Sequence, residues 1–399
     1  MNVIPIISKE IKSTQVCPTS KSYANRALIL AALKQETISL TSMPHALDVE
    51  DLIENFKKLG LEISKKTNEV IVAGSFPKNE PMSSEVIELP GSEGGTTVRF
   101  LAVLLALGNN TYKLKLKGSL ASRPMNDLLL TLIELGASAS INDKYLMIRG
   151  PIDLSKEVTI NCADTTQFAT AFILLKSIKK IKLKLLNLDS SLAYIDMSEA
   201  IVKNFVNMTK FEIPYDASSL GYFIAYGIVN QNLDIKNVYS IDYLQADSFF
   251  FTLMDRLNIK YVLSDKGLSI YQSRSFPGFV VDSRECIDLI PTLIYLACFA
   301  KSKSEFSNLK YLVHKESNRL DEMLKILRFF NGNFSYDESK DILEIYPTKL
   351  VYSLDFQFKT ADDHRMVMVY TLFLKTLEGG KIYNPDCVSK SFPDFFTRF

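Results

Sequence analysis

The sequence predicts a mixed α/β protein made of six repeats in two sets of three, and two alternating patterns support this prediction. In the first pattern, an amphipathic helix ends at Gly or Asn, and two short strands follow around a polar turn. In the second pattern, a polar cluster precedes a helix that is apolar almost all round. A helix that is apolar on every side is typical of a buried helix. The alternation of the two patterns therefore favours a repeated αβ unit around central helices.

Four clear copies of the helix–hairpin pattern occur along the chain. Their helices are followed by alternating apolar residues and by turn residues that hairpins favour. These copies begin at Asn55, Thr131, Thr252 and Ile326. We expect a fifth, weaker copy over residues 200–214 and an internal domain boundary near residues 210–216.

Six polar clusters precede the apolar helices. They span residues 19–25, 94–99, 164–167, 216–219, 286–288 and 362–365. A helix N-terminus carries about half a positive charge and several unpaired N–H groups. An ordinary cap would explain any one of these clusters. Several of them around one cleft would instead form a receptor for an anion.

The composition excludes several classes of protein. The chain has 399 residues, a net charge of +1 and 47% hydrophobic residues, which indicates two or three folded domains and no general affinity for nucleic acid. The longest apolar run, over residues 289–300, is shorter than the roughly 20 residues that a membrane helix needs. The first residues lack the pattern of a secretory signal, so we expect a cytoplasmic protein. We also expect a monomer.

The cysteines and histidines do not form a metal-binding pattern. The five cysteines are widely spaced and never form a CxxC pair, which suits a reducing compartment. The three histidines also lie far apart in the sequence. We therefore expect no structural zinc and no bound transition metal.

Cationic side chains accompany the N-terminal polar clusters. In CPTSKSYANRAL, Ser22 and Arg26 are four residues apart and share a helix face, with Lys21 at the start of the helix. In SEGGTTVRF, the two glycines allow close backbone approach to a ligand, Thr96 or Thr97 is expected to cap the helix, and Arg99 points back toward its start. A solvated helix end would also explain each segment alone.

Further cations lie beside later clusters. Arg123 precedes a proline and should be extended, and HKESNRL places Lys315 and Arg319 on one helical face. In ADDHRM, Arg365 lies at a helix start, and Lys390 follows in CVSKSFPDFF. Separately, each resembles a surface cap or ion pair. Together they provide at least six cations beside helix starts, which favours binding of a multiply charged anion.

The ordered series of motifs resembles the 5-enolpyruvylshikimate-3-phosphate (EPSP) synthase family, the 3-phosphoshikimate 1-carboxyvinyltransferases. The series is PTSKSYANRAL, GGTTVR, SRP, DTTQF, SLAYID, DASS, HKESNRL, DDHRM and CVSKSFPDFF, and it extends over residues 17–396. The resemblance implies the enolpyruvyl transferase fold, in which two globular domains of three βαββαβ repeats each close on the substrates. The expected domains are residues 17–215, and residues 1–16 with 216–399, with hinge crossings near 17 and 216.

The resemblance also implies two sets of substrate contacts. For shikimate 3-phosphate the set is Lys21, Ser22, Arg26, Thr165, Thr166, Gln167, Tyr194, Asp288 and Lys315. For phosphoenolpyruvate the set is Lys21, Gly95, Arg123, Gln167, Arg319, Arg365 and Lys390. Two phosphates and two carboxylates would meet in one cleft, so guanidinium groups and helix dipoles must offset their repulsion.

The implied reaction is attack of the 5-hydroxyl of shikimate 3-phosphate on C2 of phosphoenolpyruvate, with protonation at C3. Phosphate then leaves the tetrahedral intermediate. We assign Glu316 to the C3 proton and Lys390 to the departing phosphate. Asp288 and Lys21 are assigned to the hydroxyl. The resemblance implies neither a metal nor an organic cofactor, because electrostatic positioning can carry the chemistry.

The sequence departs from the family pattern at a few positions. Glu93 stands where an Asn is common, and Tyr311 occupies a usual Asn position. An extra carboxylate beside an anion pocket should weaken binding unless it points away or pairs with a cation.

Two alternatives stay open at this point. A UDP-N-acetylglucosamine enolpyruvyl transferase typically has a reactive Cys in the loop that here reads KGSLASRP, which contains none. A catalytically silent anion-binding homologue would have no need of Lys21, Asp288, Glu316 and Lys390.

Overall fold

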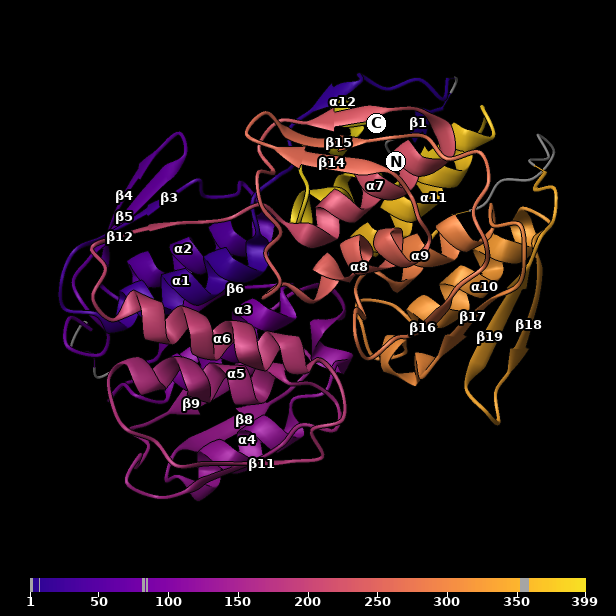
Figure 1. The fold of residues 1–399 in the computed structure, drawn as a ribbon. Helices are drawn as coiled ribbons and strands as arrows, with labels where there is room; N and C mark the ends of the chain where they lie inside the picture. The colour runs from indigo at the N-terminus through magenta and orange to yellow at the C-terminus, as the bar shows by residue number, and fades with distance from the viewer. Residues whose placement is uncertain (1–2, 7, 81–82, 84, 352–358) are drawn as a thin grey trace. The chain divides into compact units, whose positions relative to one another are not determined.

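The computed structural model describes residues 3–6, 8–80, 83, 85–351 and 359–399. The chain forms two compact units (Figure 1). Unit 1 consists of Met1–Pro18 and Tyr215–Phe399, and unit 2 consists of Thr19–Pro214.

Three apolar helices in contact with one another form the centre of unit 2, which contains three further helices. The central helices are α1 (Lys21–Leu33), α3 (Gly95–Leu105) and α5 (Gln167–Leu174). The others are α2 (Leu47–Lys58), α4 (Asn126–Glu134) and α6 (Leu192–Phe205). Every residue of α1 from Tyr23 onward is buried, as its apolar sequence predicts.

Two four-stranded sheets and one strand pair complete unit 2. The first sheet has the order β12-β3-β5-β4 and the second β6-β7-β9-β8, while β10 and β11 pair in parallel. The strands of the first sheet are β3 (Ile38–Thr41), β4 (Glu62–Lys66), β5 (Glu69–Ala73) and β12 (Lys210–Glu212). The remaining strands are β6 (Ile87–Ser92), β7 (Thr111–Leu116), β8 (Ser138–Ile141), β9 (Tyr145–Arg149), β10 (Val158–Asn161) and β11 (Leu183–Leu186). Short 3-10 helices span Gly118–Ser122 and Leu175–Ser177.

Unit 1 repeats the same plan. Its central helices, which contact one another, are α7 (Ala217–Asn230), α9 (Ile290–Ala297) and α11 (His364–Thr376). The others are α8 (Phe249–Arg256), α10 (Arg319–Phe329) and α12 (Phe395–Arg398). Its 3-10 helices span Ala246–Ser248, Leu309–Leu312 and Pro385–Lys390.

The sheets of unit 1 include strands from both of its chain segments. The orders are β14-β15-β13-β2 and β16-β17-β19-β18, and β1 pairs with β20. The strands of the first sheet are β2 (Thr14–Gln15), β13 (Leu233–Ile235), β14 (Tyr261–Ser264) and β15 (Gly267–Ile270). The others are β1 (Val3–Pro5), β16 (Val280–Asp282), β17 (Ser304–Ser307), β18 (Asn333–Asp337), β19 (Ile342–Tyr346) and β20 (Lys381–Tyr383).

The structure confirms the six apolar helices and the four clear helix–hairpin copies. The fifth copy, expected over residues 200–214, was wrong. There α6 ends at Phe205 and only one strand, β12, follows. Strand β12 pairs in parallel with β3 at the edge of an existing sheet, so its partner comes from that sheet and not from a second strand of its own hairpin.

Three of the central helices begin with a side-chain cap. The caps are Ser20 before α1, Asp216 before α7 and Asp363 before α11, each accepting from a backbone N–H. Helix α3 differs, because Gly94 occupies the cap position and has no side chain. The expectation that Thr96 or Thr97 caps α3 was therefore wrong; the Thr97 hydroxyl donates to the Asp48 carbonyl instead, at 3.1 Å.

Within the part of the chain that the structure describes, no helix is long and apolar enough to cross a membrane. All five cysteines are described and none is in a disulfide; four are buried, and Cys387 is half-buried.

Two glycines of unit 2 test how much of the fold depends on close backbone approach. Gly91 has φ +67°, and a Cβ placed there would lie 1.7 Å from the Lys115 carbonyl oxygen. Gly136 has φ +107°, but a Cβ there would meet nothing within 4 Å. Gly136→Ala should therefore lower the free energy of unfolding only by the cost of a left-handed backbone, about 1–2 kcal/mol. Gly91→Ala should lower it considerably more, because the new Cβ also collides with the Lys115 carbonyl. The urea midpoints of the two variants measure the difference. Equal losses would show that β6 and β7 can separate freely at this point.

Candidate active site

The N-terminus of α1 presents Lys21 to a buried carboxylate. The Lys21 Nζ lies 2.8 Å from the Asp48 Oδ2, and the Asp48 side chain is only 3% exposed. Asp48 lies in the first turn of α2, where a negative charge is favourable. The contact between α1 and α2 therefore fixes the position of the ammonium group.

Arg26, one turn further along α1, is a buried cation with neutral partners. Its Nε donates to the Ser198 Oγ at 2.8 Å, and its Nη1 donates to the Ser22 carbonyl at 2.9 Å. The guanidinium carbon lies 5.6 Å from the ring centre of Phe100 and 5.8 Å from that of Tyr194. Burial lowers the pKa of Arg26 to about 10. No carboxylate among the described residues forms an ion pair with it.

Two guanidinium groups converge on the first residue of α3. A Cβ at Gly95 would lie 2.8 Å from the Arg123 Nη1 and Nη2 and 2.8 Å from the Arg99 Nη1. Arg99 donates to the Gln167 Oε1 at 2.6 Å and to the Pro124 carbonyl at 2.8 Å. Arg123 is extended, with φ −88° and ψ 149°, as its place before a proline predicts. Positive groups thus gather where the helix dipole is also positive.

The starts of α5 and α6 supply the remaining predicted contacts of unit 2. Gln167 is the first residue of α5, and its backbone N–H donates to the Thr165 hydroxyl at 3.2 Å. Thr166 occupies the cap position without a side-chain cap bond. Tyr194 lies in the first turn of α6, with its ring beside Arg26. Arg99 therefore links Gln167 to the start of α3, and Arg26 links α1 to Tyr194.

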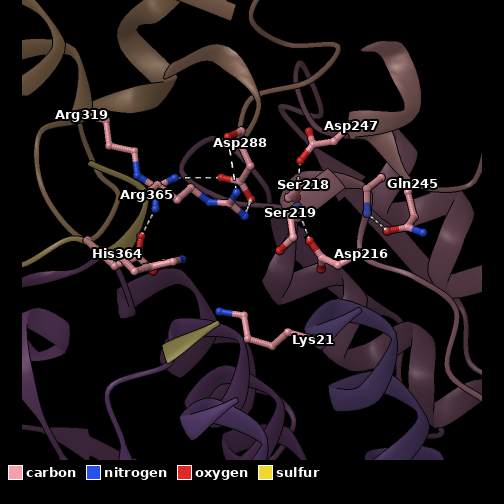
Figure 2. A network of polar contacts seen from close by, with 12 residues as sticks. Lys21, Asp216, Ser218, Ser219, Gln245, Asp247, Asp288, Arg319, His364 and Arg365 are labelled. Atoms are coloured by element: carbon pink, nitrogen blue, oxygen red, sulfur yellow. Dashed lines mark hydrogen bonds and ion pairs between the residues drawn. The ribbon is translucent and has the colours of Figure 1, made fainter. Parts of the chain in front are cut away.

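In unit 1, Arg319 is the centre of a second cluster (Figure 2). Its side chain is 2% exposed; its Nε lies 2.9 Å from the Asp363 Oδ2 and its Nη1 2.9 Å from the Asp288 Oδ1. The Nη2 contacts the Glu316 carboxylate. The three carboxylates raise the pKa of Arg319 despite its burial, so this guanidinium is permanently charged.

The structure corrects one prediction about this cluster. Lys315 and Arg319 do not share a helical face, because α10 begins only at Arg319. The Asn318 side chain accepts from the Asp321 N–H and starts the helix there, which leaves Lys315 in the preceding turn.

Asp288 receives two arginine side chains. The Arg319 Nη1 donates at 2.9 Å and the Arg365 Nη2 at 3.1 Å (Figure 2). Burial acts to raise the pKa of Asp288, but Arg365, Lys315 and Arg319 outweigh it and hold this pKa well below its usual range. Nearby, the Lys390 Nζ lies 3.6 Å from the Glu316 Oε1, which unites these two predicted residues.

Asp247, in the same unit, is a carboxyl group whose pKa is shifted in the opposite direction from that of Asp288. It lies in the 3-10 helix Ala246–Ser248, is 3% exposed and is hydrogen-bonded to the Ser218 hydroxyl (Figure 2). Burial raises the pKa of Asp247 to about 7, and the negative charge of Asp288 adds to this effect. Two carboxyl groups of unit 1, the buried Asp247 and the half-buried Asp288, thus have pKa values shifted in opposite directions.

One group of the described residues has the composition of a metal site. Ligand atoms of Glu316, Asp363 and His364 lie within 4.8 Å of one another. The Arg319 guanidinium already donates to both carboxylates. This resident cation neutralises charge that a metal would otherwise need to balance.

Comparison with known proteins shows the family of the chain. The sequence model of the family described as EPSP synthase (3-phosphoshikimate 1-carboxyvinyltransferase) matches residues 6–208 and 206–399. The chain belongs to the EPSP synthase family. This confirms the resemblance inferred from the motifs and does not favour the UDP-N-acetylglucosamine alternative.

Curated relatives of this EPSP synthase family member match it over nearly its full length. The 3-phosphoshikimate 1-carboxyvinyltransferase of Tolumonas auensis is 27% identical over 98% of this chain and 96% of its own length. That of Vibrio cholerae is 29% identical over 99% of this chain and 97% of its own length.

Solved structures share the fold. An EPSP synthase from Acinetobacter baumannii has a TM-score of 0.75 at 18% identity, with 99% of this chain and 97% of that chain covered. The enolpyruvyl transferase NikO from Streptomyces tendae has a TM-score of 0.74 at 12% identity, with 99% and 96% covered. The predicted enolpyruvyl transferase fold is therefore confirmed.

Besides Arg99, the structure adds four polar residues that were not among the predicted site residues. They are Asp48, Ser198, Asp247 and Asp363. Only Asp363 had a recognisable sequence signal, as the cap of an apolar helix. The others lie within ordinary segments, and only their tertiary partners distinguish them. Among the departures from the family pattern, Glu93 lies beside Gly118, where a Cβ would be 3.0 Å from the Glu93 Cδ, and Tyr311 packs against the unit 1 core.

The raised pKa of Asp247 predicts a pH-dependent effect on stability. The unfolded chain releases this proton near pH 4, whereas the folded protein retains it to about pH 7. Between these values, rising pH therefore favours unfolding. Asp247→Asn should raise the melting temperature relative to wild type by an amount that grows from pH 4 to pH 7 and then levels off.

The exposed Asp265→Asn variant is the control, because it also removes one carboxylate. The charged groups that bear on Asp247 are Asp288, Arg365 and Asp216. A melting-temperature difference between Asp247→Asn and wild type that stays constant with pH would contradict a shifted pKa.

Proposed function

We propose that this protein transfers the enolpyruvyl group of phosphoenolpyruvate to the 5-hydroxyl of shikimate 3-phosphate and releases phosphate. This reaction belongs to the shikimate pathway, which leads to chorismate and the aromatic amino acids. Membership of the EPSP synthase family supports the proposal. The observation that carries it is the buried Arg26, whose hydrogen-bond partners are neutral.

A buried guanidinium without a carboxylate is costly unless a ligand supplies the negative charge. Shikimate 3-phosphate carries a carboxylate and a phosphate, and either group can accept N–H bonds from an arginine. Tyr194 and Ser22 lie beside Arg26. In this proposal the shikimate 3-phosphate contacts are those predicted: Lys21, Ser22, Arg26, Thr165, Thr166, Gln167, Tyr194, Asp288 and Lys315.

Phosphoenolpyruvate is the proposed ligand of the cations around Gly95. The Arg123 and Arg99 guanidinium groups both lie beside Gly95, so an anion at this helix start could accept hydrogen bonds from both. Arg99 was not a predicted contact, and its bond to Gln167 gives it a place in the proposal. The remaining proposed contacts are Lys21, Gly95, Gln167, Arg319, Arg365 and Lys390.

Arg319 can take part while it keeps its ion pairs. Its Nη1 uses one N–H for Asp288, and a guanidinium Nη atom carries two. The second N–H can donate to a phosphoenolpyruvate oxygen.

The proposed chemistry forms the bond between the 5-oxygen and C2 while a proton reaches C3. Loss of phosphate then breaks the bond between C2 and the phosphate oxygen, while the bond to the 5-oxygen stays, and a proton leaves C3 again to give the enolpyruvyl ether. Glu316 is the proposed group for C3, and Lys390, whose Nζ lies 3.6 Å from the Glu316 Oε1, is the proposed group for the departing phosphate. Asp288, held ionised by two arginines, can accept a hydrogen bond from the 5-hydroxyl, with Lys21 as the second group.

Two substitutions test these roles. Lys21→Met and Glu316→Gln should each lower kcat by roughly 100-fold or more, because positioned acid–base groups contribute about that much. Lys9→Met, which removes an exposed ammonium paired with Glu378, is the matched control and should retain wild-type turnover. Melting temperatures of both variants close to that of the wild type would exclude unfolding as the cause of a lower kcat. Turnover near wild type in either variant would remove that residue from the mechanism.

The reaction itself is tested by the release of inorganic phosphate from phosphoenolpyruvate. We expect release with shikimate 3-phosphate and none with UDP-N-acetylglucosamine. The opposite preference would indicate the alternative transferase. A folded protein that is inactive with both acceptors would be the silent anion-binding homologue.

A further inference from the structure

Ser198 connects two of the proposed substrate contacts from outside the predicted site. It lies in α6 and its side chain is fully buried. Its Oγ accepts the Arg26 Nε–H at 2.8 Å and lies 2.5 Å from the Tyr194 carbonyl, to which it donates. One hydroxyl therefore joins the guanidinium on α1 to the first turn of α6.

The bond to the Tyr194 carbonyl is ordinary by itself, because serines in helices commonly donate to the carbonyl four residues earlier. The bond from Arg26 is the unusual one. It leaves the hydroxyl with its proton committed to Tyr194 and a lone pair committed to Arg26. The only other side-chain partner of Ser198 among the described residues, the Thr170 hydroxyl, is 3.5 Å away, too far for a strong bond.

The geometry around Arg26 shows what this bond determines. The Nε is held by Ser198, and the Nη1 is held by the Ser22 carbonyl one turn earlier in α1. Two fixed points set the plane of the rigid guanidinium fork. The rings of Phe100 and Tyr194 lie beside it. The orientation of the remaining guanidinium N–H groups is therefore fixed, and an anion can accept from them only on one side.

We propose that Ser198 is a positioning residue for shikimate 3-phosphate, which orients Arg26 and anchors Tyr194 before the ligand arrives. The inference rests on the proposed function and adds a residue to it. Ser198 acts through Arg26, and without its oxygen the buried Nε–H has no acceptor among the described residues. The guanidinium would then turn to find another acceptor, and the anion would lose a prepared partner.

Ser198→Ala is the primary test. The Kd of shikimate 3-phosphate, measured by isothermal titration calorimetry, should rise roughly tenfold or more, since a hydrogen bond from a charged group is lost. The KM for shikimate 3-phosphate should rise in parallel. The kcat, and the KM for phosphoenolpyruvate at saturating acceptor, should stay within about twofold of wild type, because the acid–base groups are untouched.

Two further variants separate positioning from packing. Ser198→Thr keeps the hydroxyl and should restore most of the affinity. Thr170→Val removes the neighbouring buried hydroxyl at nearly constant volume and should leave the Kd unchanged. If Ser198→Ala does not fold, Ser198→Cys retains the shape with a weak acceptor and should show a loss of affinity in the same direction.

The outcomes are distinct. An unchanged Kd in a folded Ser198→Ala or Ser198→Cys variant would overturn the inference. So would an equal loss of affinity in Thr170→Val, or a loss of kcat at constant Kd, because both indicate a general packing role. A folded wild-type protein that does not bind shikimate 3-phosphate would instead overturn the proposed function itself.

Discussion

The placement of buried guanidinium groups is the constraint on which both units depend. Removing an arginine from water is costly, so its surroundings must supply compensation. Around Arg319 this compensation is complete, because three carboxylates accept from it. Around Arg26 it consists of a hydroxyl, a carbonyl and two aromatic rings. The first arrangement stabilises a cluster of acids, whereas the second surrounds a positive charge with neutral groups.

Two aspartates of unit 1 show how neighbouring charges give the same side chain different pKa values. Asp288 and Asp247 are both carboxylic acids in poorly solvated surroundings, yet their pKa values move in opposite directions. Asp288 faces arginines, whereas Asp247 has a serine hydroxyl and a neighbouring negative charge. One group therefore stays ionised, and the other holds a proton near neutral pH. Carboxyl groups whose surroundings separate their pKa values in this way can take different protonation states at the same pH.

Helix ends place these groups. Lys21, Gly95, Gln167, Arg319 and His364 are each the first residue of a helix. The apolar bodies of the central helices leave their polar ends as the places where chemistry can occur. Much of this was predictable from the sequence, because apolar helices with polar starts form a local pattern with a regular period. Two predictions from the sequence failed. The fifth hairpin does not form because β12 pairs with β3 at the edge of an existing sheet. Lys315 and Arg319 do not share a helical face because the Asn318 cap starts α10 at Arg319.

The sequence by itself determined the family, the six central helices, the four hairpins and the cations that accompany the helix starts. Each of these features follows from a local motif or from the periodic spacing of apolar residues along the chain. Only the tertiary structure decided that Asp48 pairs with Lys21, that Ser198 holds Arg26 and that Asp247 keeps its proton. The physical reason is that hydrogen bonds and pKa values depend on distance and burial. Partners such as Arg26 and Ser198 are 172 residues apart in the chain, and no local pattern records that they meet.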